Sequence, residues 1–284
     1  MNKAFFFYNI FISAYLKYFY FFKEKFFYFF CKKKLKKILS NKRPLVSIIL
    51  PTFNRSAMLE SRSIRSVLKQ SYKNFELLVI SDGCTDNTDE VIRDFNDPRI
   101  KLYKILRNKK RYPETALNHW LMGPAYAINE GLSNIKGDWI ARIDDDDIWA
   151  KDHLKTSLDL LYQSKCEFVS NPRLQLSDGK FKIVHSPSVW PYNKKYKVLL
   201  GSVSSWIYAS YLSFVKVNVN SWRKNNNRIN DIDLLERILN LNVRTCYKKK
   251  ATLIGLPRKK NSLVGSKYYI HNEQEILDKY NIEK

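Results

Sequence analysis

The chain has 284 residues, 45% of them hydrophobic, which is enough for one large α/β domain with an ordinary core. Its formal net charge is +23, from 50 Lys and Arg against 27 Asp and Glu. Such a surplus favours an anionic partner, for example a phosphorylated ligand or an acidic membrane face. The four cysteines are scattered and form no CxxC pair, which argues against a zinc site and against a disulfide framework.

Residues 1–43 differ in composition from the rest of the chain. Eleven of the seventeen phenylalanines lie between positions 5 and 30, and basic residues dominate from 32 to 43. The longest uncharged run, Ala4 to Leu16, is too short to span a bilayer, which takes about 20 residues. At helical spacing, a polar stripe is formed by Asn9, Ser13, Lys17 and Glu24. This pattern is typical of an aromatic helix that lies in the membrane interface, and the basic run would add attraction to anionic lipid.

Two alternatives for this segment stay open. A short basic start followed by an apolar run also resembles a signal peptide, although no A-x-A-like cleavage site follows. A tilted transmembrane helix of low hydrophobicity is the second alternative. We expect a location on the cytoplasmic face of the membrane, either peripheral or with a single N-terminal anchor.

After Pro44 the chain alternates between apolar runs and helical patterns. Buried strands are predicted at Val46–Leu50, where Pro51 should end the strand, and at Phe75–Ile80, Ile100–Ile105 and Trp139–Ile143. Helices are predicted at 56–70, from Thr85 or Asp86 onward, and at 124–132, 153–164 and 230–241. Further strands are predicted at 168–170 and 174–184, the latter with a turn at Asp178–Gly179. This order predicts an α/β fold with right-handed parallel units.

The strand predicted at Trp139–Ile143 is followed directly by four carboxylates, Asp144 to Asp147. They should lie at the carboxyl edge of the sheet, where open α/β sheets bind ligands. Four adjacent negative charges repel one another, and a divalent cation would compensate them because hard cations prefer oxygen ligands. A solvated acidic loop or a helix N-cap is the simpler alternative.

Three segments together resemble the family-2 glycosyltransferases, which adopt the GT-A fold. They are Val46–Arg55, Phe75–Asn87 and the Asp144 cluster with the residues before it. The resemblance covers roughly residues 45 to 240 and implies a Rossmann-like mixed sheet flanked by helices. The chain then divides into a membrane-associating segment (1–43), a GT-A catalytic domain (44–256) and a basic C-terminal tail (257–284).

The resemblance implies a nucleotide-sugar donor, usually a UDP-sugar, and Mn²⁺ or Mg²⁺. Donor-binding positions implied in this way are Pro51, Thr52, Asn54, Arg55, Asp82, Asn129, Asp144 and Asp145. Asp144–Asp146 matches the D-x-D motif of the family, with Asp146 as the metal ligand; Asp145–Asp147 is the competing frame.

The resemblance also implies the groups on the acceptor side. The helix that starts at Asn230 is similar to the family's Glu-Asp helix, so Asp231 is the expected catalytic base and Asp233 is its alternative. Ser205 and Trp206 resemble the acceptor-side wall, although core packing explains a lone tryptophan nearly as well.

The chain departs from the family pattern at three positions. Ser81 stands where a first acid is common, and Asn230 stands where Glu is common. The Ala-Arg-Asn motif reads Ala127–Asn129 and lacks its arginine, so we expect Arg107 or Arg111 of the preceding basic loop to replace it at the diphosphate.

These features predict an inverting, metal-dependent glycosyltransferase that acts on a saccharide or a lipid-linked saccharide. A nucleotidyltransferase that acts on sugar phosphates is the alternative enzyme, but the first strand lacks a Gly-rich basic loop. A basic nucleic-acid-binding or membrane-binding protein is the non-enzymatic alternative. Nucleic acid is not the expected partner, because the aromatic residues concentrate at the N-terminus instead of within a recognisable binding motif.

Overall fold

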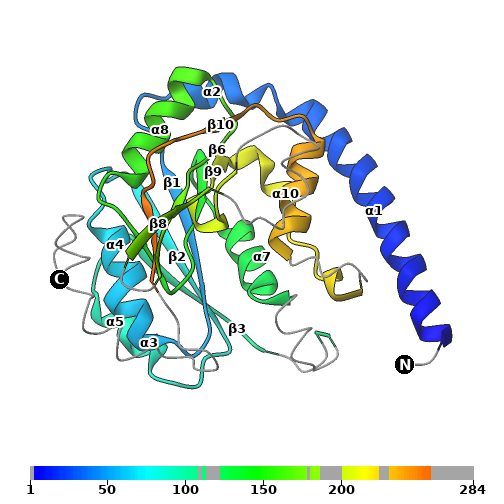
Figure 1. The fold of residues 1–284 in the computed structure, drawn as a ribbon, viewed down its shortest axis with the longest axis horizontal. Helices are drawn as coiled ribbons and strands as arrows, with labels where there is room; N and C mark the ends of the chain where they lie inside the picture. Colours follow the sequence, from blue (N-terminus) through cyan, green and yellow to red (C-terminus); the bar gives the residue numbers. More distant parts are fainter. Residues whose placement is uncertain are drawn as a thin grey trace.

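The computed structural model describes residues 3–107, 111–112, 122–177, 180–185, 200–223 and 230–256. A seven-stranded mixed sheet with the order β10-β6-β9-β4-β1-β2-β3 forms the centre, and helices cover both of its faces (Figure 1). The mixed α/β architecture expected from the sequence is confirmed.

The first half of the chain builds four parallel strands, and β1 pairs with both β2 and β4. Their bounds are β1 Val46–Thr52, β2 Phe75–Asp82, β3 Ile100–Ile105 and β4 Trp139–Arg142. Every residue of β1, β2 and β4 is buried, as the continuous apolar runs predict for a sheet covered on both faces.

The prediction that Pro51 ends the first strand is wrong. Pro51 pairs with Ile80 of β2, and β1 continues to Thr52. The pairing of β1 with β4 stops at Ile49 and Arg142, so the missing N–H of Pro51 costs no hydrogen bond on that side.

The predicted helices are present, α8 with the predicted bounds and the others with shifted ends. Residues 56–68 form one helical segment with a π-helical middle: α3 Ser56–Met58, η1 Leu59–Ile64 and α4 Arg65–Leu68. The others are α5 Thr88–Asp94, α7 Ala125–Asn134, α8 His153–Ser164 and α10 Asn230–Asn240. Gly131 lies inside α7, where a Cβ atom would come within 2.6 Å of the Ile49 side chain, so the glycine permits close helix–sheet packing.

The second half extends the main sheet with β6 Phe168–Ser170, β9 Ile207–Ala209 and β10 Thr245–Tyr247. β9 runs antiparallel to both β4 and β6, which makes the sheet mixed. A second sheet contains β5 Asp147–Trp149, β11 Leu253–Gly255, β7 Arg173–Ser177 and β8 Lys180–Val184. The turn predicted at 178–179 and the tail 257–284 lie outside the described residues. Short 3₁₀ turns are η2 Val203–Ser205, η3 Ser210–Phe214 and η4 Ser221–Arg223.

The N-terminal segment forms two helices, α1 Lys3–Cys31 and α2 Lys34–Ser40. α2 belongs to the packed domain, because Leu35 and Ile38 are buried in the main core. The hydroxyl of Tyr162 also donates to the backbone oxygens of Ile38 and Asn41, at 3.0 and 2.9 Å. The long helix α1 runs past η3, η4 and α10 at one side of the domain (Figure 1). The domain boundary at residue 43 stays a prediction.

The polar and aromatic sides of α1 face opposite directions. Two members of the polar stripe face the domain: Asn9 is 8% exposed and Glu24 is 3% exposed. The side chains that are more than half exposed are Phe7, Tyr8, Phe11, Tyr15, Tyr18, Phe22, Phe26, Phe29 and Phe30. The helix therefore binds its own domain through these polar groups and through Tyr20, Phe27 and Tyr28, and presents most of its other aromatic rings outward. Among the helices of the described ranges, none combines the length and apolarity that crossing a bilayer requires.

Candidate functional site

The carboxyl ends of β1, β2 and β4 meet at one edge of the sheet, as the strand order requires. The hydroxyl of Thr52, the last residue of β1, donates to Asp145 Oδ2 at 3.0 Å. Arg55 follows in the loop after β1, and its Nη1 lies 2.8 Å from Asp145 Oδ1 and 3.6 Å from Asp146 Oδ2. The structure thus brings together four of the residues that the sequence singled out.

Each carboxylate of the acidic run lies beside an arginine. Arg55 contacts the middle two acids, Arg142 Nη2 donates to Asp144 Oδ1 at 3.0 Å, and Arg173 Nη2 donates to Asp147 Oδ1 at 2.9 Å. The arginines come from the β1 loop, from β4 itself and from β7. The expectation that a divalent cation must compensate the acids was therefore too narrow, because guanidinium groups already do part of this.

Burial makes two of these acids hard to ionise. It raises the pKa of Asp145 to about 6, although Arg55 opposes the shift. It raises the pKa of Asp147 to about 7, against the opposing charge of Arg173. A desolvated carboxylate is stabilised by any further cation that approaches it. Additional positive charge at this edge of the sheet would therefore stabilise the ionised carboxylates.

The donor set fits a divalent ion that arrives together with a phosphate ligand. In the part of the chain that the structure describes, no three His, Cys, Asp or Glu side chains come together as a protein-only metal cage. Mg²⁺ is usually held by one or two carboxylates plus substrate phosphates. Asp144 and Asp146, at the end of β4, supply such carboxylates.

Both arginines expected at the diphosphate lie beside the acid that ends β2. Arg111 Nη1 donates to Asp82 Oδ1 at 2.6 Å, and Arg107 Nη1 lies 3.6 Å from Asp82 Oδ2. The Arg107 guanidinium also covers the ring of Phe53 at 3.9 Å. Gly83 has φ +68° and a Cβ atom there would come within 2.6 Å of Arg107 Cβ, so this turn requires glycine. Two positive charges therefore lie beside Asp82 at the end of β2.

Asn54 and Asn129, which are also expected to bind the donor, form hydrogen bonds that connect separate segments of the domain. Asn54 (φ +50°) accepts from the Thr85 N–H at 2.8 Å and donates to its hydroxyl at 3.1 Å, which joins the loops after β1 and β2. Asn129 binds the backbone of Val217 in both directions, at 2.9 and 2.7 Å, and so attaches α7 to the segment before α10. Asn129 therefore connects these two segments, and its role at the donor stays a prediction.

Arg142 connects the acidic run to the expected base. Its Nη1 donates to Asp231 Oδ1 at 2.6 Å while its other nitrogens bind Asp144. Burial opposes its charge, but Asp144 and Asp231 raise the pKa of Arg142, so it stays protonated. Burial raises the pKa of Asp231, and Arg142 opposes this shift. Nothing in the family motifs singles out Arg142; the signal was an arginine within a buried apolar strand.

The two acids at the start of α10 point to different surroundings. Asp231 reaches Arg142 at the sheet edge, whereas Asp233 Oδ2 accepts from Arg237 Nη1 at 3.2 Å on the side of α1. This separation is what the helix phase requires, since residues two apart lie on nearly opposite faces. Asp231 is therefore the acid of this helix that faces the acidic run.

The acceptor-side candidates are mostly packed into the domain. Trp206 is 1% exposed, donates to Gly201 O at 3.0 Å and packs on Phe168, which is the core role left open above. The hydroxyl of Ser205 donates to Ser202 O at 2.6 Å. Its neighbour Ser204 reaches the acids, because its hydroxyl accepts from the Asp144 N–H at 3.1 Å.

Curated proteins of known name share sequence with this chain. UDP-Glc:alpha-D-GlcNAc-diphosphoundecaprenol beta-1,3-glucosyltransferase WfgD of Escherichia coli is 34% identical over 145 residues, which is 51% of this chain and 49% of that protein. GalNAc(5)-diNAcBac-PP-undecaprenol beta-1,3-glucosyltransferase of Campylobacter jejuni is 35% identical over 106 residues, 37% of this chain and 30% of that protein. The chain spans about half, or less, of the length of these relatives.

Solved structures share the fold. S. aureus TarS in complex with UDP has a TM-score of 0.55 at 19% identity, over 75% of this chain and 60% of that one. The mannosyltransferase PcManGT of Pyrobaculum calidifontis, in complex with GDP-Man and Mn²⁺, has a TM-score of 0.55 at 17% identity, over 89% and 69%. The expected GT-A fold is confirmed. The model of glycosyl transferase family 2 matches residues 47–221, more than half of the chain, and the protein therefore belongs to that family.

Proposed function

We propose that this protein is an inverting glycosyltransferase that moves a sugar from a UDP-sugar to a hydroxyl of a lipid-linked saccharide. The observation that carries the proposal is the placement of Arg142 between Asp144 and Asp231. It puts a helix-borne carboxylate opposite the acids that end β4. We assign the donor sugar to the space beside this bridge, with its leaving group toward the acids and its acceptor toward Asp231.

We assign the nucleotide-sugar donor to the carboxyl edge of the sheet. Pro51, Thr52, Asn54 and Asp82 line the nucleotide, and Asp144 and Asp145 lie toward the ribose. Asp147 is part of β5 and bound to Arg173, which favours the frame Asp144–Asp146 with Asp146 as the metal ligand. Mn²⁺ or Mg²⁺ held there would neutralise the charge that develops on the departing diphosphate. Arg55, Arg107 and Arg111 add positive charge around the same position.

The acceptor end is assigned to Asp231. A carboxylate base must be ionised to take the proton of the attacking hydroxyl. Burial works against ionisation, and the hydrogen bond from Arg142 works for it. Arg142 also fixes the direction of the carboxylate. With one base and direct displacement, the anomeric centre is inverted.

The membrane is the proposed location of the acceptor. The two curated relatives described above are named for acceptors linked to undecaprenol by a diphosphate. The exposed aromatic side of α1 carries lysines among its rings, for example Lys25 Nζ at 4.3 Å from the Phe21 ring centre. Aromatic rings and lysines together suit the headgroup level of an anionic leaflet. We therefore place the protein on the cytoplasmic face, with α1 in the plane of the interface.

The test is to incubate the purified full-length protein with a panel of sugar nucleotides, Mn²⁺ or Mg²⁺, and an undecaprenyl-diphosphate-linked monosaccharide. Mass spectrometry should find the acceptor one sugar heavier with one donor, and nuclear magnetic resonance should show the inverted anomer. If the protein instead joins UTP to a sugar 1-phosphate and leaves the acceptor unchanged, it is a nucleotidyltransferase.

A further inference from the structure

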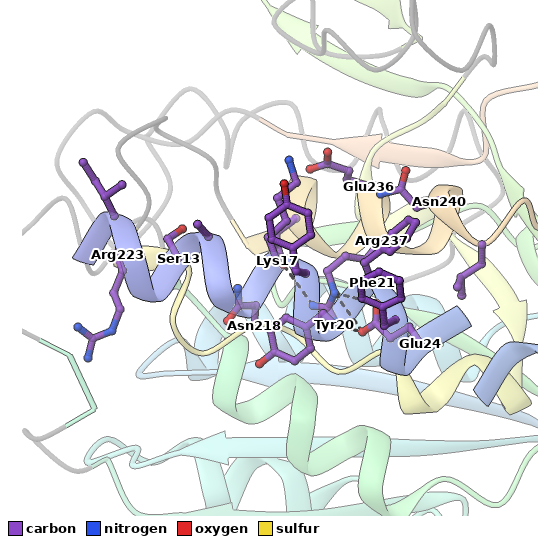
Figure 2. A pocket seen from close by; sticks show the side chains of 16 residues that line it. Ser13, Lys17, Tyr20, Phe21, Glu24, Asn218, Arg223, Glu236, Arg237 and Asn240 are labelled. Atoms are coloured by element: carbon purple, nitrogen blue, oxygen red, sulfur yellow. Dashed lines mark hydrogen bonds and ion pairs between the residues drawn. The ribbon is translucent and has the colours of Figure 1, made fainter. Parts of the chain in front are cut away.

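A groove of about 650 Å³ lies between α1 and α10 (Figure 2). The apolar and aromatic residues of its α1 wall are Ile10, Ala14, Tyr18, Tyr20, Phe21 and Phe22, and the opposite wall includes Glu236 and Asn240 of α10 and Leu241 directly after it. This volume is within the roughly 300–1,000 Å³ that is typical of small-molecule sites. None of the donor-binding or base residues assigned above lines it.

A buried ionic contact holds the two helices at the spacing that leaves the groove. Arg237 of α10 donates to both carboxylate oxygens of Glu24, with Nε at 3.1 and 3.2 Å, and to Asp233. At the other end of α1, Arg223 donates to Asn9 Oδ1 at 2.5 Å. Polar contacts therefore attach α1 to the domain near Asn9 and near Glu24. The apolar residues between these two positions line the groove.

The character of the lining points to an apolar occupant. Three cationic side chains, Lys17, Arg223 and Arg237, are balanced by three anionic ones, Glu24, Asp233 and Glu236. A groove without net formal charge does not select an anion. Its α1 wall is instead rich in aromatic rings that border the exposed aromatic surface of the same helix. The groove is therefore continuous with the surface that we place in the membrane interface.

The groove also begins beside the catalytic helix. Asp233, which lines it, is in the same first turn of α10 as Asp231. The two side chains leave the helix on different faces of the same turn, so the groove and the proposed base lie within one turn of the same helix. A lipid-linked saccharide has this shape, with an apolar chain at one end and the reacting sugar at the other.

We propose that the groove between α1 and α10 binds the isoprenoid chain of the lipid-linked acceptor. This rests on the proposed function, and it assigns the lipid part of the substrate to residues outside the donor site. α1 then has two roles: its outer face contacts the membrane, and its inner face guides the extracted chain toward Asp231.

A matched pair of substitutions tests the groove. Ala14→Trp puts a large ring into it without removing an existing contact, whereas Tyr15→Trp places the same ring on the neighbouring outward position. Farnesyl diphosphate is the soluble probe, and inorganic diphosphate is the control ligand. Calorimetry should show binding of farnesyl diphosphate to the wild type and to Tyr15→Trp, at least about tenfold weaker binding to Ala14→Trp, and no binding of inorganic diphosphate at this site.

Enzyme kinetics with two kinds of acceptor distinguish a failure of the groove assignment from a failure of the glycosyltransferase function. With the lipid-linked acceptor, Ala14→Trp should raise KM and leave kcat and donor hydrolysis unchanged. With a water-soluble glycoside acceptor, it should act like the wild type. Equal binding of farnesyl diphosphate by both variants would overturn the groove assignment, and so would its displacement by an equal concentration of short-chain phosphatidylglycerol. If the probe binds and Ala14→Trp blocks it, but no sugar is transferred to any acceptor, the isoprenoid site stands and the proposed function fails.

Discussion

At the scale of single residues, Arg142 sets the ionisation of the proposed base. Burial raises the pKa of Asp231 and Arg142 opposes this. In Arg142→Lys the cation remains, but a single, shorter ammonium group cannot keep the guanidinium contacts with both Asp144 and Asp231, so the pKa of Asp231 should rise further. Because the base acts only when ionised, the acidic limb of kcat/KM should move to higher pH. Arg173→Lys, which changes the partner of Asp147, is the control and should leave the limb in place; an unmoved limb in Arg142→Lys contradicts the role.

Asp231 itself should be needed for turnover and not for donor binding. General-base catalysis is typically worth about 10² to 10⁴ in rate. We expect Asp231→Asn to lower kcat by roughly that factor while the affinity for UDP, measured by calorimetry, stays nearly constant. Asp233→Asn is the control, because Asp233 binds Arg237 on the other face of the helix. Should Asp233→Asn be the inactive variant, the base has been assigned to the wrong acid.

Asp146 should connect the metal to the donor. Its Oδ2 lies 3.6 Å from Arg55 Nη1, so the fold already balances part of its charge without a metal. We expect Asp146→Asn to abolish the Mn²⁺-dependent part of UDP binding and to leave the circular dichroism spectrum and Tm nearly unchanged. Calorimetry with and without EDTA measures this. A Mn²⁺-dependent affinity equal to that of the wild type would move the metal to a neighbouring acid.

At the scale of secondary-structure elements, the attachment of α1 to α10 depends on one buried ion pair. Burial raises the pKa of Glu24 because it disfavours the charged carboxylate, and Arg237 opposes this shift. Hydrogen bonds to charged groups contribute about 1.5–3 kcal/mol each. Glu24→Gln should therefore loosen α1, which limited proteolysis and hydrogen exchange in residues 3–31 would detect. Lys23→Gln, on the exposed neighbouring position, should leave both unchanged; equal protection in the two variants would show that the pair does not hold the helix.

At the scale of the whole molecule, the outward aromatic surface of α1 should govern membrane binding. Phe11, Phe26 and Phe30 are exposed and do not line the groove. Replacing all three by Ser should reduce co-sedimentation with vesicles that contain anionic lipid by at least about tenfold, since each loses apolar burial of roughly 1.5–3 kcal/mol. Transfer to a water-soluble acceptor should be retained. Undiminished vesicle binding would show that the basic residues alone suffice.

The strands of the catalytic domain could be predicted from the sequence because their signal is local. Continuous apolar runs mark strands buried on both faces, so β1, β2 and β4 and the edge that carries the acids followed from the residues themselves. The helix at 230–241 was predicted locally in the same way, but only the contacts with Arg142 and Arg237 separated Asp231 from Asp233. The end of β1 could not be predicted from the local sequence. The strand can include Pro51 only because its pairing with β4 stops before that residue.

Only the tertiary structure decided which partners these residues meet. The arginines beside the acids lie at positions 55, 142 and 173, and no local pattern relates them. Likewise, periodicity identified two faces of α1 but not which one contacts the domain. The buried partners Arg237 and Arg223 decide this, because a polar face gains more from two guanidinium groups than an aromatic face would. Spacing along a helix or strand fixes which side chains share a face; what covers that face depends on residues far away in the chain.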